Sequence, residues 1–464
     1  MLKRIANYAI ALAIIGIGCL LPGFGGLSTE GVSAVSVLVS MIYMISTGVP
    51  AGVMCLTAVC SLQLTGLTAS LAETVSYFSS PFLVATLMAI ATGVALERTT
   101  IVNRVLLFAI NKLGASVRGV IFAMWITIIV ISSVNANMTA AAILLPFAWR
   151  FIDMYKDENE KRKTARCLLV GLCIAVVLGG MITPLGNGCN MVVMQQMAGI
   201  GYELNFATWA AFGVPLCVIA MLIAAWLLFK MFQPADLSRE EVEAFGRAIK
   251  VDSPLTSKER LLLVIYAVLI ALCLMCSFWP TLFKKIDVMW ILAATGVLLV
   301  YPFGVLEWKD VEQSGAFTST YFICAFMMMS GIIQKWGVVE VIMAAISNII
   351  SSKASYFLII TLLGYLCIPM GDILPSAVVP TVLTVPLAML AESLGLNPVM
   401  LVLPVAMYAG ATWMLPLDTV AIMTFQKGYY SVGDMFKPGL IMTIIFPPLT
   451  AGVSLAVGAL LGML

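Results

Sequence analysis

Two stretches interrupt long apolar runs with proline and polar residues: Thr183-Pro184-Leu185-Gly186-Asn187-Gly188-Cys189-Asn190 and Leu415-Pro416-Leu417-Asp418-Thr419-Val420-Ala421-Ile422. Each lies about 45 residues after another apolar run that polar residues break, Ser132 to Asn137 in the first half and Met370 to Asp372 in the second. The same order of parts therefore occurs twice in one hydrophobic chain. Paired interruptions at corresponding positions of two halves are typical of the midplane binding site of a secondary transporter.

The composition of the chain is that of a membrane protein. Of its 464 residues, 62% are hydrophobic and 10% are charged, and the mean hydropathy is +1.07. A soluble protein carries about 25% charged residues. Apolar runs long enough to cross a hydrocarbon core of roughly 30 Å recur, as at 208–231, 259–279, 315–333 and 438–463. The first run follows Lys3 and Arg4 and is read as a membrane helix rather than a signal peptide. We expect a multi-pass protein of the cell's inner (plasma) membrane.

Charge, cysteine and histidine content exclude several classes of function. The net charge of +2 argues for neither nucleic acid nor an acidic partner. Eleven cysteines lie mostly inside apolar runs without paired spacing, which indicates reduced thiols rather than a disulfide framework. Histidine is absent, so neither Ser-His-Asp catalysis nor a Cys-His zinc site can form. We therefore expect no enzyme, and no cofactor other than a coupling ion.

The distribution of positive charge predicts how the chain crosses the membrane. We place full spans at about 5–22, 33–47, 50–66, 80–97, 208–231, 259–280, 287–303, 315–334 and 438–463. Two further spans, about 167–200 and 399–426, are broken. Two pairs of apolar runs, 117–133 with 139–152 and 354–370 with 376–392, are read as re-entrant hairpins over about 117–152 and 354–392. With a cytoplasmic N-terminus, 21 of the 25 Lys and Arg lie inside and only Lys284, Lys285, Lys335 and Lys353 lie outside, as the positive-inside rule expects. If either hairpin were one full crossing, every later segment would change sides, and the Lys and Arg residues would no longer collect on the cytoplasmic side.

The chain divides into four parts. Residues 1–77 are expected to form N-terminal scaffold helices, and 232–316 a cytoplasmic linker with connecting helices. Residues 78–231 and 317–464 follow one plan: an opening span, an amphipathic stretch, a hairpin, a broken span and a last full span. The amphipathic stretches, 101–113 and 338–350, are typical of helices that lie along the membrane interface. The first copy starts outside and the second inside. We therefore expect an all-α polytopic membrane protein with two inverted repeats and a binding site at their shared interface.

In this plan the chain resembles the divalent anion/sodium symporters, a family of ion transporters that carry dicarboxylates, citrate or sulfate. The resemblance covers roughly residues 75–464 and is strongest from Phe78-Ser79-Ser80-Pro81 to Thr99, from Gly179 to Asn190, and at Glu307-Trp308-Lys309-Asp310-Val311. It implies a homodimer and an elevator-type movement of a transport domain. It also implies that hairpin tips and helix breaks bind sodium and the carboxylates of the substrate.

The motifs of this family are degenerate in the present sequence. A Ser-Asn-Thr motif belongs at each hairpin tip, but Ala136-Asn137-Met138 occupies the first and Met370-Gly371-Asp372 the second. The first break keeps the pattern Thr-Pro-x-Gly, whereas the second reads Leu415-Pro416-Leu417-Asp418. Side-chain donors that would hold a second carboxylate are therefore missing. This weakens the dicarboxylate prediction and leaves the fold prediction unchanged.

Asp372 and Asp418 are the only two of the 23 acidic residues that fall inside apolar membrane runs. An ionised carboxylate there costs several kcal/mol unless it is paired, and the same runs contain neither Lys nor Arg. The remaining partners are a bound cation, a proton or the positive end of a broken helix. Asp372 and Asp418 are therefore predicted to frame a second cation site. The alternative is that each merely caps a half-helix, and both interpretations can hold together.

The first half offers neutral ligands. Carried over by position from the family, Ser132, Ala136, Asn137 and Gly186 would frame a first cation site, for Na+, to which Ala136 contributes only its backbone. The predicted substrate-binding residues are Asn137, Thr139, Thr183, Pro184, Asn187, Asn190, Ser376, Pro416 and Thr419. An Asn amide both donates and accepts hydrogen bonds, although helix packing would also account for Asn137 and Asn190. Ser and Thr commonly bond to their own helix in membranes.

These observations favour uptake of a small anion, expected to be a di- or tricarboxylate, coupled to Na+ or H+. The partners would be the anion, the coupling ion and the lipid bilayer. A cation/proton antiporter that exchanges Na+ for H+ at Asp372 and Asp418 is the alternative. A membrane enzyme or a scaffold is the third hypothesis, and the absence of a visible nucleophile–base set or metal-ligand cluster disfavours it.

Overall fold

The computed structural model describes residues 2–76, 81–202, 204–249, 251, 254–279, 282, 288–349, 355–374 and 376–464, and within them the chain is all-helical. The helices are α1 (Leu2–Leu20), α2 (Thr29–Ser46), α3 (Ala51–Leu64), α4 (Leu71–Ser76), α5 (Pro81–Glu97), α6 (Ile101–Leu113), α7 (Val117–Ser132), α8 (Asn137–Ile152), α9 (Glu158–Gly180), η1 (Pro184–Gly186), α10 (Gly188–Gly199), α11 (Phe206–Phe232), α12 (Arg239–Ala248), α13 (Ser257–Phe278), α14 (Val288–Val300), α15 (Trp308–Gln313), α16 (Ala316–Lys335), α17 (Val338–Ile349), α18 (Tyr356–Ile373), α19 (Val378–Ser393), α20 (Pro398–Ala409), α21 (Thr419–Phe425) and α22 (Val432–Leu460). The all-α prediction is confirmed. Outside the described residues lie Phe78-Ser79-Ser80, Lys250, Lys284, Lys285 and Lys353, which contributed to the repeat and charge arguments.

Seven of the described helices are long and apolar enough to cross a membrane: α2, α9, α11, α13, α16, α18 and α22. Shorter apolar helices accompany them, among them α7, α8, α19 and α20. The chain is thus a multi-pass membrane protein, as its composition predicted.

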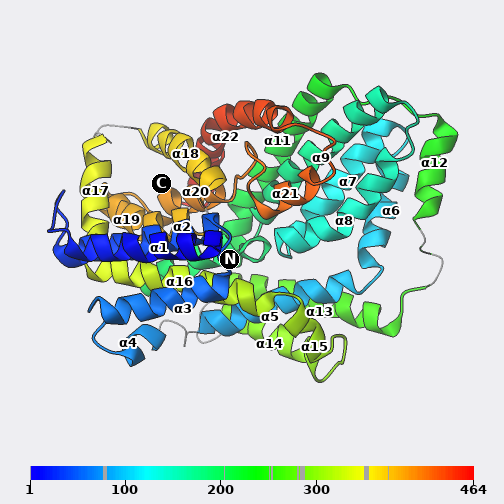
Figure 1. The fold of residues 1–464 in the computed structure, drawn as a ribbon. Coiled ribbons are helices and arrows are strands. Elements are labelled where there is room, and N and C mark those ends of the chain that lie inside the picture. Colours follow the sequence, from blue (N-terminus) through cyan, green and yellow to red (C-terminus); the bar gives the residue numbers. More distant parts are fainter. Residues whose placement is uncertain are drawn as a thin grey trace.

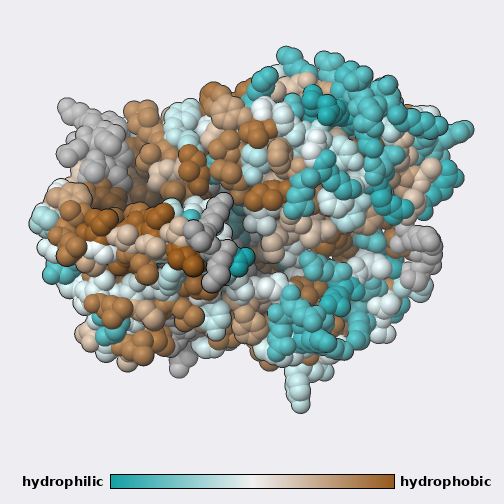
Figure 2. All heavy atoms as spheres, viewed as in Figure 1, coloured by the Kyte–Doolittle hydropathy of each residue, from teal (hydrophilic) through white to brown (hydrophobic). Residues whose placement is uncertain are grey.

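The amphipathic helices lie at the two ends of the molecule. Figure 1 shows α6 and α12 at one end and α17 at the other, with α1, α2, α3 and α16 running lengthwise between them. The α7–α8 pair lies towards the α6 end, where α6 packs on α7, and the α18–α19 pair lies towards the α17 end, where α17 packs on α19. Hydrophilic residues gather over the half that holds α6 and α12, whereas hydrophobic residues dominate the opposite half (Figure 2).

Polar residues of the sequence set where several helices begin. Ser116 caps α7 by accepting a hydrogen bond from Gly119 N at 3.2 Å. Ser238 and Thr256 start α12 and α13, each in a capping box in which side chain and backbone groups satisfy each other. Such caps supply partners for N–H groups that a helix leaves free, so these starts are encoded locally.

Both quoted stretches interrupt their apolar runs. α9 ends at Gly180, a short 3-10 turn spans Pro184–Gly186, and α10 starts at Gly188. α20 ends at Ala409 and α21 starts at Thr419, with irregular backbone between them. Proline lacks an N–H, so Pro184 and Pro416 disfavour a continuous helix through these stretches. Proline alone does not set the position of the interruptions, because α11 and α22 continue through prolines. We refer to residues 181–187 as break 1 and to residues 410–418 as break 2.

One helix end differs from the sequence prediction, which ended the first leg of the second hairpin at residue 370. α18 continues through Gly371 and Asp372 to Ile373, and Leu374 N donates to Met370 O at 2.8 Å. The helix accommodates the buried Asp372 carboxylate because backbone amides of break 2 bind it, as described below. A distant partner of this kind leaves no signal in the local sequence.

Candidate functional site

The tip of the α7–α8 pair meets break 1 through Ser132 and Asn137. Ser132 Oγ donates to Val176 O of α9 at 2.8 Å. In the amide orientation that satisfies its hydrogen bonds, Asn137 donates to Ser132 Oγ at 2.5 Å and to the carbonyl oxygens of Gly186 and Val176, each at 3.2 Å. Three residues predicted for the first cation site, Ser132, Asn137 and Gly186, therefore lie in contact. The fourth, Ala136, is the N-cap of α8 and offers no side-chain cap.

Glycine is required where these segments approach one another. A Cβ on Gly186 would lie 2.6 Å from Ser132 O and 2.7 Å from both Cα and O of Gly180. A Cβ on Gly179 would lie 2.7 Å from Ile129 O. These neighbours are backbone atoms, which cannot rotate away. The close packing of break 1 on the helix tip therefore depends on side chains being absent here.

Thr183 and Asn190 hold the irregular backbone of break 1. Thr183 Oγ1 accepts from Leu185 N at 3.1 Å and donates to Ser133 O at the helix tip. Asn190 Nδ2 donates to Gly180 O at 2.8 Å and to Thr183 O at 2.9 Å. Unsatisfied backbone groups cost several kcal/mol each in an apolar environment. Both side chains thus have a structural task, whatever else they bind.

In the second half, Asp372 reaches break 2. This residue is 3% exposed, and its carboxylate accepts from Met414 N at 3.1 Å and from Leu415 N at 3.3 Å. Asp418 is the N-cap of α21 and accepts from Val420 N at 3.1 Å. Both carboxylates therefore lie at break 2, and each has backbone N–H partners there.

A cavity of about 400 Å³ lies where the two halves meet. Four of the predicted residues line it: Ala136 and Thr139 from α8 and its cap, Asn187 from break 1, and Ser376 from the tip of the α18–α19 pair. Asn187 also caps α10 by accepting from Cys189 N at 3.1 Å. The other predicted residues do not line this cavity: Ser132, Asn137, Thr183, Pro184, Gly186, Asn190, Asp372, Pro416, Asp418 and Thr419.

Sequence reasoning missed cavity residues that lie outside the helix tips and breaks. Glu97 ends α5, while Ser314 and Thr318 lie just before and inside α16, and all three line the cavity. A signal was present in the sequence, because α5 and α16 correspond to the opening spans of the two predicted repeats. Asn135 lies at the tip of the α7–α8 pair and is not among the residues that line the cavity. It is 2% exposed, and its Nδ2 has no hydrogen-bond partner among the described residues.

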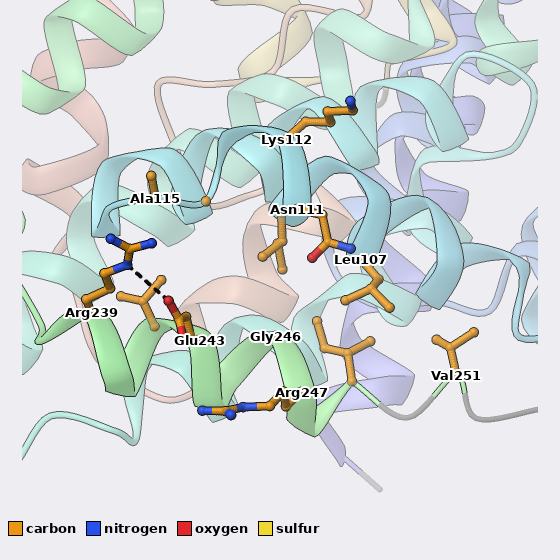
Figure 3. Close-up of a pocket in the computed structure, with 13 residues that line it drawn as sticks. Leu107, Asn111, Lys112, Ala115, Arg239, Glu243, Gly246, Arg247 and Val251 are labelled. Atoms are coloured by element: carbon orange, nitrogen blue, oxygen red, sulfur yellow. Dashed lines mark hydrogen bonds and ion pairs between the residues drawn. The ribbon is translucent and has the colours of Figure 1, made fainter.

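A second hollow, of about 740 Å³, lies between α6 and α12 (Figure 3). Its lining includes Lys112, Arg239 and Arg247, and Arg239 pairs with Glu243 at 3.0 Å. Helix tips and breaks contribute nothing to this lining, and neither does any residue predicted for the site. The two hollows differ in chemistry, because the residues that line the central cavity include neither Lys nor Arg. The central cavity is therefore the candidate functional site.

Residues 2–464 match the family described as the sodium:sulfate symporter transmembrane region, and the chain belongs to this family. The resemblance inferred from the sequence is thereby confirmed. This is a family of transporters and not of enzymes.

Three relatives illustrate the similarity. The sodium-dependent dicarboxylate transporter SdcS of Staphylococcus aureus (strain USA300) is 21% identical over 383 residues, which are 76% of this chain and 72% of that protein. The Na(+)/citrate cotransporter of Rattus norvegicus is 25% identical over 346 residues, 62% of this chain and 60% of that protein. An uncharacterized transporter of Methanocaldococcus jannaschii is 22% identical over 346 residues, 74% of this chain and 75% of that protein.

Proposed function

We propose that the protein is a secondary transporter that takes up a small carboxylate anion together with Na+. The observation that carries this proposal is the central cavity, which is lined by residues from both helix tips and from break 1 of a multi-pass membrane protein. Relatives whose names state sodium-coupled transport of dicarboxylates and citrate support it. A di- or tricarboxylate is thus one candidate substrate, and the charges around the cavity bear on that choice below.

The first cation site would consist of oxygen atoms that already converge. Ser132 Oγ and the carbonyl oxygens of Val176 and Gly186 surround the amide of Asn137. With its nitrogen turned inward, the two N–H groups of this amide are shared among the three oxygens. With Oδ1 turned inward, the Ser132 hydroxyl would be the one hydrogen-bond donor among these four oxygen atoms, and a cation among them would relieve the repulsion that remains. Backbone carbonyls of broken helices are known Na+ ligands, so rotation of this amide would accompany sodium binding.

The second cation site would be formed by Asp372 and Asp418. Both carboxylates accept backbone N–H groups, and a carboxylate with free lone pairs can bind a cation as well. The alternative function, a Na+/H+ antiporter, would use the same two residues without an organic substrate. One observation favours it: Asp372 is 3% exposed, and neither Asp372 nor Asp418 has an ion-pair partner among the described residues, so a proton could neutralise their charge in place of Na+.

Inverted repeats with re-entrant hairpins are part of the proposal. The α7–α8 pair and the α18–α19 pair approach the cavity from opposite ends of the molecule (Figure 1). Five ion pairs among the described residues each join groups assigned to the same side of the membrane: Arg98–Asp310, Lys161–Asp153, Arg166–Asp434 and Arg239–Glu243 inside, and Lys335–Glu73 outside. Three of these pairs link distant parts of the chain, so they support the predicted topology.

An elevator-type movement would let helix tips and breaks cross the membrane as one body. Support comes from a separate apolar cluster, in which side chains of α1, α2, α3 and α16 pack together and touch Cys189, Ala377 and Val378 near the cavity. Because this contact is apolar, no ion pair within it would have to break when the helix tips and breaks slide along α1, α2, α3 and α16. The homodimer is carried over from the family and is tested by the mass of the purified protein in detergent.

The decisive experiment is uptake into liposomes that contain the purified protein. A labelled carboxylate should accumulate only when an inward Na+ gradient is imposed. Exchange of Na+ driven by a pH gradient, with no organic anion present, would establish the antiporter instead. The topology has its own test: in a cysteine-free background, Ser116→Cys and Ser393→Cys should react with an impermeant reagent from opposite faces. Labelling of both from one face would reject the inverted repeat.

A further inference from the structure

The electrostatic character of the cavity differs between its two sides. On the side of the first half, α8 starts at Ala136, which supplies no side-chain cap. The first N–H groups of a helix have no partner within it and carry partial positive charge. Thr139 and Asn187 add a hydroxyl and an amide beside this helix end. This side can therefore bind one carboxylate.

The opposite side, at the tip of the α18–α19 pair, offers fewer hydrogen-bond donors. Asp372 and Asp418 lie at break 2 in the same half but do not line the cavity. α19 begins after Ala377 without a side-chain cap, but its third residue is Pro380, which has no N–H to donate. This side therefore offers a second carboxylate fewer backbone N–H groups than the start of α8 offers the first.

No basic side chain is among the residues that line the cavity. Among the residues that line it, Glu97 is the one with a charged side chain, and its charge is negative. Much of the remaining lining is apolar, namely Val94, Met138, Ala142, Leu185, Phe322 and Ile323. Transfer of a second carboxylate from water into this cavity would be costly, because no cationic side chain would replace its hydration. An apolar group has no such hydration to lose.

We propose that the cavity takes an anion with a single carboxylate, bound at the start of α8, and an apolar body that lies against Met138, Phe322 and Ile323. This inference rests on the proposed function and specifies its substrate class. The volume of about 400 Å³ suits a small organic acid. The positive charge of Na+ at the two cation sites would stabilise the single carboxylate of the substrate, and no second carboxylate would need to be neutralised.

Matched pairs of acids test the proposal. Butyrate and valerate differ from succinate and glutarate mainly by a methyl group in place of one carboxylate. The measurement is the shift in unfolding temperature of the purified protein on addition of each anion, at pH 7.5, in NaCl and in choline chloride. We expect Na+-dependent stabilisation by the monocarboxylates at concentrations at least about tenfold below those needed for the dicarboxylates. The detergent-solubilised protein avoids the leak of protonated butyrate through lipid.

The outcomes separate the two proposals. Tighter Na+-dependent binding of succinate or glutarate would overturn the monocarboxylate inference and leave the sodium-coupled transporter standing. An absence of Na+-dependent binding of every acid would overturn both. Glu97→Gln should reduce the preference for the monocarboxylate severalfold, because it removes a negative charge from the lining. Glu240→Gln, on the exposed side of α12, should leave the preference unchanged, and an equal effect of both variants would reject the role of Glu97.

Discussion

Replacement of Gly186 with alanine should weaken Na+ binding at the first cation site. A Cβ there would lie 2.6 Å from Ser132 O and 2.7 Å from Gly180 O, at least 0.7 Å inside the 3.4 Å where ordinary contact begins. Both neighbours are backbone atoms, so relief requires movement of main chain. The Gly186 carbonyl, 3.2 Å from the Asn137 amide, would move with it.

The expected magnitude follows from the cost of overpacking. An added methyl group in a well-packed interior costs about 1–3 kcal/mol. The oxygen atoms must converge most closely in the Na+-bound state, so the strain falls mainly on that state. Because 1.4 kcal/mol corresponds to a tenfold change, the Na+ concentration for half-maximal binding should rise by about 5- to 150-fold.

The assay is thermal unfolding of the purified protein across a series of NaCl concentrations at constant ionic strength. A bound ion raises the free energy of unfolding by RT ln(1 + c/Kd), where c is the Na+ concentration, so the Na+ concentration at which the unfolding temperature begins to rise reports Kd, and no substrate needs to be known. Gly199→Ala is the matched control, since Gly199 ends α10 on the same broken run and a Cβ there meets nothing within 4 Å. If Gly186→Ala kept both the stability and the Na+ dependence of this control, the packing argument would be refuted.

Two further predictions concern carboxylates. Asp372→Asn and Asp418→Asn should each raise the Na+ concentration needed for the same stabilisation by about 10- to 150-fold, because a neutral amide replaces a charged group whose hydrogen bonds contribute about 1.5–3 kcal/mol. Wild-type Na+ dependence in both variants, as in the control Glu240→Gln, would reject the second cation site. In the α8–α9 connection, the hydrogen bond from Lys161 lowers the pKa of Asp153. That pair should therefore stabilise the fold above the ordinary pKa of an aspartate and lose its effect as the pH falls through the lowered value. Asp153→Asn should cost at most about 1 kcal/mol at neutral pH and progressively less on acidification, and an unfolding series in which the deficit grows at low pH would contradict this assignment.

Much of the helix pattern was predictable, because its signals are local. The amphipathic stretch 101–113 became α6 with the same bounds, and the apolar run 117–133 became α7. Caps such as Ser116, together with the prolines of breaks 1 and 2, mark where a helix starts or stops. The predicted end of the first leg of the second hairpin, at residue 370, was wrong. α18 continues past Met370, and this continuation depends on hydrogen bonds to another segment.

The candidate site was predictable only in part. Ala136, Thr139, Asn187 and Ser376 line the cavity because helix tips and breaks must meet away from lipid. Thr183 and Asn190 were marked by the same pattern, yet their side chains hold backbone groups of break 1. A polar residue in an apolar membrane segment indicates that its side chain has a hydrogen-bonding partner. It does not indicate whether that partner is a ligand or the protein's own backbone.

The sequence alone was enough to establish a helical membrane protein with two interrupted segments. The reason is that a bilayer requires apolar segments of a certain length, and length and polarity can be read directly from each segment. Folding alone decided which polar atoms face the cavity and which face main chain. Asp372 and Met414, for example, lie 42 residues apart and meet only because α18 packs on α20 in one register. Register arises from the fit of many side chains at once, and no single segment encodes it.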